Sequence, residues 1–338
     1  MKKLFIISNE SIYKNDDNYF CDNIDLKSTP EGLNRNFEVS LLARKSLKNR
    51  AFNIKLKDIK IFDSIFSFVY AVINSALNKN SKYLIISISP YTFLACIFLR
   101  LFGKTPSVYL RSDGYEEYKS ILGFIGPIIY HLMFIIVSSI SNLVSCRNYI
   151  LKGRKGAIVY PSQLDSEWFD NSREKKIENI KLLYIGRIRV EKGIFSLLEL
   201  IKGKNNFSLT IVGAEQNSKK INQKNIKVYE NETNKKNLIK FYDDHDIFIL
   251  PSFTEGYPMV LLESLARKRP VIIFEEIKHV IGDKKGIFVS KRNYESLLIT
   301  INKIKNNYLE IQEKMKQNNL PTKKEFIRKM GNIISDLN

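Results

Sequence analysis

The residues best suited to chemistry in this sequence are two carboxylates, Glu255 and Glu263, which lie eight positions apart between two apolar strands. Eight residues is slightly more than two helical turns. Gly256 and Pro258 predict a turn followed by a helix, which brings Glu263 to the side of the loop that carries Glu255. The first N–H groups of that helix lack intrahelical partners and attract an anion. The pattern therefore predicts an anion at the helix start with two carboxylates holding hydroxyl groups beside it, and a sugar nucleotide has all of those groups.

A second cluster supplies positive charge. In KLLYIGRIRVEK, at 181–192, a strand ends at Ile185 and Gly186 permits a tight turn. Arg187 and Lys192 follow in the loop and at the start of the next helix. Two fixed cations at the carboxyl end of a strand can neutralise a diphosphate as charge accumulates on it. A solvated charged loop is the alternative for this segment alone, and the Glu255 segment favours the diphosphate.

Four short motifs carry a family resemblance. GRIRVEKG at 186–193, TIVG at 210–213 and PSFTEGYPMVLLESLA at 251–266 resemble the retaining glycosyltransferases of family 4, the group 1 glycosyl transferases. PSQLDSEWF at 161–169 resembles the Pro-Asn-Gly-Val-Asp segment that ends the first domain of that family. The motifs occur in the expected order and spacing, so the resemblance is specific for the second half of the chain. It implies an α/β GT-B fold, with two Rossmann-like doubly wound domains facing a cleft.

The resemblance implies a role for each matching residue. Arg187 and Lys192 would bind the nucleotide diphosphate as the leaving group, and Glu255 would contact the transferred sugar near its reacting carbon. Glu263 would accept hydrogen bonds from the ribose hydroxyls. The alternative for both glutamates is that they cap a positive helix end. Further donor-binding residues would be Gly186, Gly213, Glu230, Gly256, Tyr257, Pro258, Met259 and Val260, with Gly213 and the loop near Glu230 beside the base.

The acceptor-side candidate lies in VYLRSDGYEEY at 108–118, which follows a strand and ends in a turn at Gly114. The resemblance implies a histidine or an acid here, facing the acceptor. Asp113 is the candidate catalytic residue, with Arg111 as an alternative that would bind an anionic acceptor. An Asp-Gly turn closed by the Asp113 side chain is the structural alternative.

Two segments depart from the family pattern. Ser8-Asn9-Glu10-Ser11 replaces the Gly-Gly loop that lies close to the donor phosphate, and the polar stretch up to Leu33 has one glycine, Gly32. Glu275-Glu276-Ile277-Lys278-His279 replaces the Gly-Gly-x-x-Glu segment after the penultimate strand. The first departure indicates an altered acceptor loop, and the second affects recognition of the donor sugar.

No metal requirement is predicted. Asp244-His245-Asp246 resembles the Asp-x-Asp metal motif of the other large glycosyltransferase fold, but Asp246 directly precedes an apolar strand, where it more plausibly caps the strand entry. The histidines His131, His245 and His279 are scattered and have no metal-ligand spacing. The only co-substrate expected is a nucleoside-diphosphate sugar, UDP- or GDP-linked, and no further cofactor is expected.

The elements that must position these residues alternate between short apolar strands and longer helical stretches, which predicts parallel sheets covered by helices. A chain of 338 residues fits two domains. We expect an acceptor-side domain at 1–169, a polar linker at 170–179 and a nucleotide-sugar domain at 180–320. A C-terminal helix at 321–338 follows, and packing back on the first domain is one possibility for it.

Charge and composition bear on location. Three widely spaced cysteines and a short apolar start of four residues predict a reducing cytoplasm without a disulfide frame or leader. The net charge of +19 is spread over both halves. It indicates either a generally cationic surface or attraction to an anionic membrane, and no nucleic-acid-binding motif is visible. The segment 120–146 has no charged side chain, and it is a partly buried helix, an interfacial helix or a membrane span.

The sequence therefore predicts a retaining, metal-independent glycosyltransferase. Its acceptor would be a lipid-linked or cell-envelope glycan at the inner face of the cell membrane, with the enzyme bound there peripherally. One alternative is a non-hydrolysing sugar-nucleotide epimerase on the same fold, which needs no acceptor. Another alternative is a catalytically degenerate GT-B protein that acts as a scaffold for membranes or glycans. This alternative is disfavoured because the chain retains Arg187, Lys192, Glu255 and Glu263. The sequence does not fix the oligomeric state.

Overall fold

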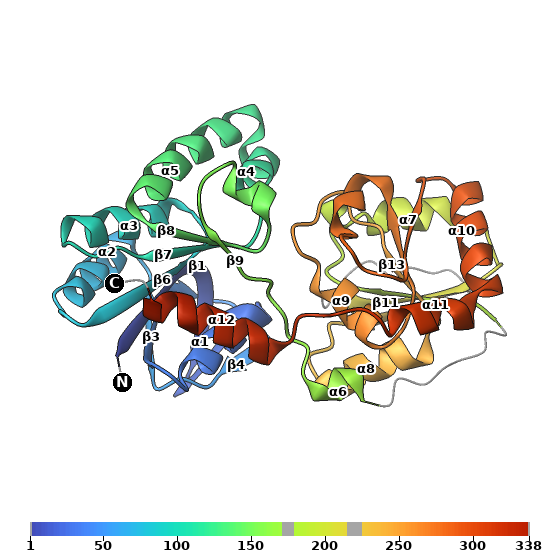
Figure 1. The fold of residues 1–338 in the computed structure, drawn as a ribbon, viewed down its shortest axis with the longest axis horizontal. Helices are drawn as coiled ribbons and strands as arrows, with labels where there is room; N and C mark the ends of the chain where they lie inside the picture. Colours follow the sequence, from blue (N-terminus) through green and yellow to red (C-terminus); the bar gives the residue numbers. More distant parts are fainter. Residues whose placement is uncertain (1, 171–178, 215–224, 337–338) are drawn as a thin grey trace. The chain divides into compact units, whose positions relative to one another are not determined.

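The computed structural model describes residues 2–170, 179–214 and 225–336, and it contains two compact units, each built on a mostly parallel sheet (Figure 1). The first unit comprises Met1–Gln163 and Lys323–Asn338, and the second comprises Leu164–Thr322. The expected domain end at 169 thus falls inside the second unit. The linker expected at 170–179 lies, apart from its two end residues, outside the described residues.

The first unit has a central parallel sheet in the order β5-β3-β1-β6-β7-β8-β9. Two short antiparallel strands, β2 and β4, continue from the end of β1. Most of the central strands are buried, as expected for a parallel sheet covered on both faces. The strand bounds are β1 (Lys3–Asn15), β2 (Asn18–Cys21), β3 (Glu38–Ser46), β4 (Phe52–Ile54), β5 (Asp58–Phe62), β6 (Ser81–Ile86), β7 (Ser107–Leu110), β8 (Asn142–Ser145) and β9 (Ala157–Ile158).

Helices cover this sheet in two groups (Figure 1). Helices α2 (Ile65–Ala76), α3 (Pro90–Leu101) and α5 (Gly126–Ile140) lie side by side, with α3 in contact with both neighbours. Helix α1 (Ile24–Leu33) packs with the C-terminal helix α12 (Lys323–Asp336) over another part of the core. The C-terminal segment therefore belongs to the first unit.

The segment after the first strand differs from the sequence expectation. From the sequence, Ser8-Asn9-Glu10-Ser11 is expected to replace the loop that follows the first strand in the family. Instead β1 continues to Asn15, because Ser11–Tyr13 resume pairing with β3 after a register shift. Ile12 is fully buried there. The side chain of Asn23 then accepts a hydrogen bond from the Asp25 N–H and begins α1.

The second unit contains the doubly wound sheet that the sequence predicts. Its six strands are all parallel, in the order β12-β11-β10-β13-β14-β15. This is the 3-2-1-4-5-6 order in which ligands bind beyond the carboxyl ends of the strands, where the order reverses. That point lies between β10 and β13. The strand bounds are β10 (Lys181–Ile185), β11 (Ser208–Ala214), β12 (Ile226–Glu230), β13 (Ile247–Leu250), β14 (Val271–Phe274) and β15 (Ile287–Ser290).

Short helices connect these strands and complete one apolar core around the sheet. Their bounds are α6 (Ser166–Phe169), η3 (Val190–Lys192), α7 (Ile194–Leu200), α8 (Lys235–Asp244), α9 (Met259–Ala266), η4 (Glu275–Val280), α10 (Tyr294–Asn306) and α11 (Tyr308–Met315). Helix α9 begins directly after Pro258, as the sequence predicts.

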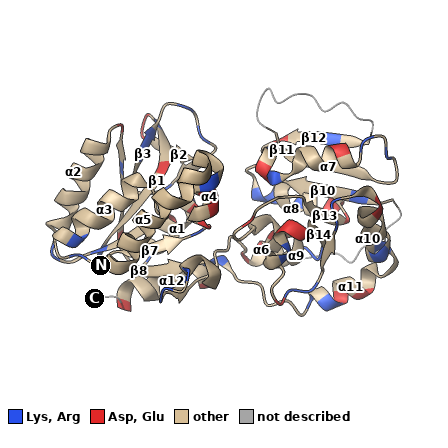
Figure 2. Ribbon diagram, turned by 90° about the horizontal axis from the view of Figure 1, so that it is seen from above, with Lys and Arg blue, Asp and Glu red and all other residues tan. Residues whose placement is uncertain are grey.

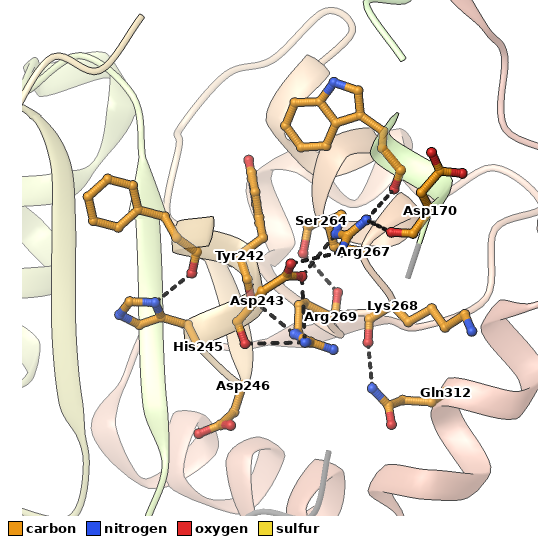
Figure 3. Close-up of polar contacts among 12 residues, drawn as sticks. Asp170, Tyr242, Asp243, His245, Asp246, Ser264, Arg267, Lys268, Arg269 and Gln312 are labelled. Carbon is orange, nitrogen blue, oxygen red and sulfur yellow. Dashed lines mark hydrogen bonds and ion pairs between the residues drawn. The ribbon is translucent and has the colours of Figure 1, made fainter. Parts of the chain in front are cut away.

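Two arginines buried in the second unit join α6, α8 and the end of α9 (Figure 3). Arg267 is 2% exposed and donates to both carboxylate oxygens of Asp243, at 2.9 and 2.7 Å. Its third nitrogen donates to the carbonyls of Trp168 and Asp170, at 3.1 and 2.6 Å. Arg269 donates to the Tyr242 carbonyl at 3.0 Å. This network fixes the chain where it enters the second unit and holds the end of α8 against α9.

We predict that Arg267→Ala strongly destabilises the second unit. The change removes the two hydrogen bonds to Asp243, which keeps a 3.8 Å contact with Arg269, and the hydrogen bonds to the Trp168 and Asp170 carbonyls. Breaking a buried ion pair costs about 3–5 kcal/mol. Urea unfolding followed by circular dichroism measures the effect. Lys240→Ala, an exposed change on the same helix as Asp243, is the control and should alter stability little. A loss below about 1 kcal/mol, the range of exposed pairs, would show that the network is not structural.

Candidate active site

The site lies at the carboxyl ends of two neighbouring strands, β10 and β13. The loop after β10 carries Arg187 and leads to Lys192, and the loop after β13 carries Glu255. Gly193 allows the two loops to meet. A Cβ at Gly193 would lie 1.9 Å from the Pro251 carbonyl oxygen, and its φ is +66°. Glycine at this position is therefore a steric requirement of the approach.

Lys192 and Glu255 form an ion pair, which the sequence analysis did not predict. The Lys192 Nζ lies 2.7 Å from the Glu255 Oε1, with the two side chains 24% and 9% exposed. Ser252 donates its hydroxyl to the same oxygen at 2.7 Å. The carboxylate is thus held by two donors on one oxygen, which fixes its orientation at the mouth of α9. An ion pair this far removed from solvent is less screened than a surface pair.

The Glu255 loop is held by residues that the sequence analysis missed. Arg292, which follows β15, donates to the Pro251 carbonyl at 3.0 Å, and its guanidinium lies over the Phe253 ring at 4.2 Å. The same guanidinium donates to Glu276 at 2.7 Å. This hydrogen bond lowers the pKa of the Glu276 carboxyl below its usual range. Arg292 carries no signal in the sequence, because only the fold brings it next to a loop 40 residues away.

The segment that replaces the family's Gly-Gly-x-x-Glu pattern forms η4 and contacts the same loop. His279 lies with its Nε2 2.7 Å from the Glu255 carbonyl oxygen, to which it donates. Glu276, from the first turn of η4, binds Arg292. The departure from the family pattern therefore supplies side chains that position the Glu255 loop.

Glu263 lies on α9, and its carboxylate is oriented by a hydrogen bond from Tyr242 of α8. The Tyr242 hydroxyl lies 2.9 Å from the Glu263 Oε2 and 3.2 Å from the Val260 carbonyl oxygen. Burial, and then the charge of Glu263, raise the pKa of Tyr242 well above its usual value, so the hydroxyl stays a donor. Figure 3 shows Tyr242 beside the buried Arg267 network. Arg269 donates to the Tyr242 carbonyl, so the residue that contacts Glu263 is itself held in the interior of the unit.

The two glycines proposed for donor binding meet at the same edge of the sheet. A Cβ on Gly213 would lie 2.2 Å from the Gly186 carbonyl oxygen, so the ends of β10 and β11 approach closely only with glycine. Arg187 follows and is exposed. Its carbonyl accepts a hydrogen bond from the Tyr184 hydroxyl at 2.8 Å. Glu230, the last residue of β12, pairs in register with Ala214 at this edge.

The structure therefore brings most of the predicted donor residues to one edge of one sheet. Gly256, Tyr257, Pro258, Met259 and Val260 form the turn and the first residues of α9, beside Glu255. Their roles toward a ligand stay predictions. This edge of the sheet combines the exposed cation of Arg187, the ion-paired carboxylate of Glu255 and the start of α9, whose N–H groups suit an anion.

The candidates of the first unit are engaged in internal contacts. Asp113 caps α4 (Gly114–Leu122) by accepting from the Tyr115 N–H at 3.1 Å, and its other oxygen binds Lys152 at 2.6 Å. This is the closed Asp-Gly turn considered from the sequence. The acceptor-side catalytic role of Asp113 stays a prediction.

Arg111 fits the role of an anion-binding residue poorly. Its guanidinium lies 2.7 Å from the Asp25 carboxylate and 3.3 Å from that of Glu10. Burial by itself lowers the pKa of Arg111, but these two carboxylates raise it above the ordinary value. The positive charge is thus compensated within the unit.

The Asp244-His245-Asp246 segment has structural contacts. As predicted, Asp246 closes the strand entry, since its carboxylate accepts from the Lys181 N–H at 2.8 Å. His245 donates to the Phe241 carbonyl at 2.6 Å, and its Nε2 lies 2.7 Å from the Thr210 hydroxyl. Over the part of the chain that the structure describes, no three His, Cys, Asp or Glu side chains are grouped to hold a metal ion.

Comparison with known proteins gives a family and a fold. Residues 165–320 match the family model "Glycosyl transferases group 1". No curated protein matches the sequence. The fold of the whole chain is similar to that of sucrose-phosphate synthase from Thermosynechococcus elongatus, with a TM-score of 0.69, 12% identity and coverage of 100% of this chain and 99% of that one.

Two further solved structures share the fold. The Anabaena protein HepE, in complex with UDP and glucose, aligns with a TM-score of 0.71 and 11% identity over 100% of both chains. WaaG, a glycosyltransferase involved in lipopolysaccharide biosynthesis, aligns with a TM-score of 0.66 and 15% identity over 98% of this chain and 99% of that one. The predicted GT-B fold, with two Rossmann-like domains, is confirmed.

We predict that Arg292→Ala loosens the Glu255 loop. A hydrogen bond to a charged group contributes about 1.5–3 kcal/mol, so the Phe253 amide, which donates to the Glu191 carbonyl at 3.0 Å, should exchange with solvent roughly ten- to hundredfold faster. Native-state hydrogen exchange measures this. Amides of β10 should keep their protection, and Lys291→Ala, an exposed neighbour, is the control. Unchanged exchange at Phe253 would remove the clamping role of Arg292.

Proposed function

We propose that the chain moves a sugar from a nucleoside diphosphate to an acceptor hydroxyl with retention of configuration. The match of residues 165–320 to the family model of the group 1 glycosyl transferases supports this proposal. The observation that carries this proposal is the contact of Lys192 with Glu255, 2.7 Å apart, at the mouth of α9. This contact places Lys192, proposed to bind the diphosphate, next to Glu255, proposed to bind the sugar. The strand order places this pair at the point where ligands of such sheets bind.

The chemistry asked of the site is stabilisation of a departing diphosphate. The bond from the sugar's anomeric carbon to the phosphate oxygen breaks while the acceptor oxygen bonds to the same carbon. Negative charge then develops on the diphosphate, and Arg187, Lys192 and the N–H groups at the start of α9 would stabilise it. These cations would serve the purpose that a metal serves elsewhere, which supports metal-independent transfer.

Retention is proposed to follow from substitution on the front face of the sugar. Glu255 is proposed to act by binding and not as a covalent nucleophile, with one of its oxygens held by Lys192 and Ser252. The acceptor proton would instead pass to the departing phosphate oxygen, so that the products are the glycoside and the free nucleoside diphosphate. Glu255 would orient the sugar hydroxyls, and Glu263, held by Tyr242, the ribose hydroxyls.

A UDP-sugar is the first donor to test, with GDP-sugars next. The Anabaena neighbour is described with UDP and glucose, and this supports uridine as the base at the edge formed by Gly213 and Glu230. A thermal-shift panel of UDP-, GDP- and ADP-sugars identifies the donor, because a ligand that binds the folded state raises the melting temperature by mass action. The absence of a shift with every nucleotide sugar would favour a degenerate scaffold.

The acceptor is proposed to be a lipid-linked or cell-envelope glycan, reached from the cytoplasmic side of the membrane. The net charge of +19 supports attraction to an anionic surface. The similar fold of WaaG, which is involved in lipopolysaccharide biosynthesis, supports a glycan acceptor of the cell envelope. A donor that is isomerised and released with no acceptor present would point to an epimerase instead.

We predict that Arg187→Ala lowers turnover by two to three decades with little loss of stability. The side chain is exposed, whereas loss of one preorganised contact to developing charge costs about 2.7–4 kcal/mol in the transition state. Release of the nucleoside diphosphate, with the donor found by thermal shift, measures the rate. Arg189→Ala, an exposed arginine two residues later, is the matched control. Wild-type turnover in Arg187→Ala would contradict the proposed role.

A further inference from the structure

The first unit exposes a continuous apolar surface on the helical hairpin formed by α4, η1 (Gly123–Ile125) and α5. Phe124 is 82% exposed, Ile121 73% and Leu132 60%. We call this surface the apolar hairpin face. It consists of Ile121, Leu122, Phe124, Ile125, Ile128, Ile129, Leu132, Ile135 and Ile136. These are nine of the 24 exposed large hydrophobic side chains in the described residues, so the clustering is not the ordinary scatter of single apolar residues on a protein surface.

Helix α5 is apolar on both of its sides. Tyr130, Met133, Phe134 and Val137 are buried on the inner side. The outward side would be polar on a helix that faces water. Here it repeats Ile and Leu at helical spacing, with His131 and Ser139 as exposed polar residues, and Figure 2 shows no Lys, Arg, Asp or Glu along α5. The outward side therefore needs an apolar environment that the described residues do not provide.

The hairpin is rigidly built. A Cβ on Gly126 would lie 2.0 Å from the Tyr118 carbonyl oxygen, so α4 and α5 approach as closely as glycine allows. The Tyr115 ring packs against that of Tyr130 at 4.9 Å, and its hydroxyl lies 2.8 Å from the His131 Nδ1. The outward side chains are thus presented on a fixed support and do not belong to a loose loop.

The geometry favours insertion at the membrane surface over a span. One helical stretch in the described chain, Gly114–Ile140, is long and apolar enough to cross a membrane, which by itself is weak evidence. The turn at Gly123 divides it. The 15 residues of α5 reach about 22 Å, short of the roughly 30 Å of a hydrocarbon core. The buried side of α5 packs on the unit, and the helix leads directly into β8.

Charge and composition point to lipid as the occupant. The loop KGRK at 152–155 is exposed and adjoins the hairpin, since Lys152 lies 2.6 Å from Asp113 and over the Tyr115 ring at 5.2 Å. The first unit has 26 Lys and Arg against 14 Asp and Glu, a net charge of +12 over residues 1–163 and 323–338. The face itself is almost entirely Ile and Leu, whereas protein interfaces favour Tyr, Trp, Met and Arg. Glu116 and Glu117 lie in the first turn of α4, beside the residues that Lys152 contacts, so these acids and the basic loop are together at the opposite end of that helix from Phe124.

We propose that the apolar hairpin face lies in the boundary between head groups and acyl chains of an anionic membrane, with Phe124 inserted and the loop at 152–155 at the head groups. The inference deepens the proposed function, because it identifies the surface by which a transferase of lipid-linked acceptors reaches them. It makes the first unit a peripheral membrane module whether or not the second unit transfers sugar.

Sedimentation of the full chain with vesicles tests the proposal. The wild type should bind vesicles of phosphatidylcholine with 30% phosphatidylglycerol at 150 mM NaCl, and Phe124→Asp/Ile128→Asp should lower the partition coefficient at least tenfold. Ile299→Asp, a 68% exposed residue of the second unit, is the control and should bind as the wild type does. Arg154→Ala/Lys155→Ala should weaken binding to anionic vesicles. Equal binding of the wild type and the hairpin variant would overturn the proposal.

Depth and partner are resolved by a second measurement. Tryptophan fluorescence of Phe124→Trp, relative to the wild type with its buried Trp168, should be quenched most by lipids brominated near the carbonyl groups. Strongest quenching by lipids brominated at the bilayer centre would indicate a membrane span. If the wild type forms an oligomer in lipid-free solution and the Phe124→Asp/Ile128→Asp variant is a monomer, the face would be a protein interface. Either result would overturn the proposal.

The thermal shift with the donor separates this inference from the proposed function. It should be equal in the wild type and in the hairpin variant, because the apolar hairpin face belongs to the first unit and the proposed donor residues belong to the second. Vesicle binding with no response to any nucleotide sugar would leave the membrane module standing and refute the transferase. A normal thermal shift with the donor but no vesicle binding would support the transferase and refute the membrane module.

Discussion

The ion pair between Lys192 and Glu255 is the contact on which the site of the second unit depends. Neither residue can reach the other unless the loops after β10 and β13 touch, and Gly193 makes this possible by leaving room for the Pro251 carbonyl. Once paired, the two side chains are partly removed from solvent, so their charges are fixed in place before any ligand arrives. A site arranged in this way does not have to reorganise when charge develops on a leaving group.

The support of this pair extends well beyond the motif residues. Arg292 and His279 hold the backbone of the Glu255 loop, and Tyr242 holds Glu263. Tyr242 itself is fixed by the end of α8, where the buried Arg267 and Arg269 bind. Positions of side chains at the edge of the sheet are thus determined in part by hydrogen bonds formed in the interior of the unit.

The sequence predicts the second unit well because its strands are buried on both faces. Short apolar runs allow few alternatives, and the two apolar strands expected on either side of the Glu255 segment are β13 and β14, at 247–250 and 271–274. Arg292 was missed for the opposite reason, since its role arises only when β15 is placed beside β14. The long β1 was missed because residues 8–15 are mostly polar, and pairing with β3 decides their structure. The first unit gave few motifs, so Asp113 rests on resemblance alone.

The segment 120–146 shows a different limit of sequence reasoning. A run without charges is compatible with a buried helix, which the sequence favours, with an interfacial helix or with a span, because each excludes water from apolar side chains. In the structure, one side of α5 packs on the core of the first unit, and the other side is exposed. The sequence alone cannot separate these two sides, since both repeat apolar residues at helical spacing.

The most direct test of the central claim is a crystal structure of the chain with its nucleotide sugar bound. We expect the diphosphate within hydrogen-bond distance of Arg187 and Lys192 at the start of α9, with the ribose hydroxyls on Glu263 and the sugar beside Glu255. A diphosphate bound elsewhere on the second unit, with the Lys192–Glu255 pair facing only solvent, would contradict it.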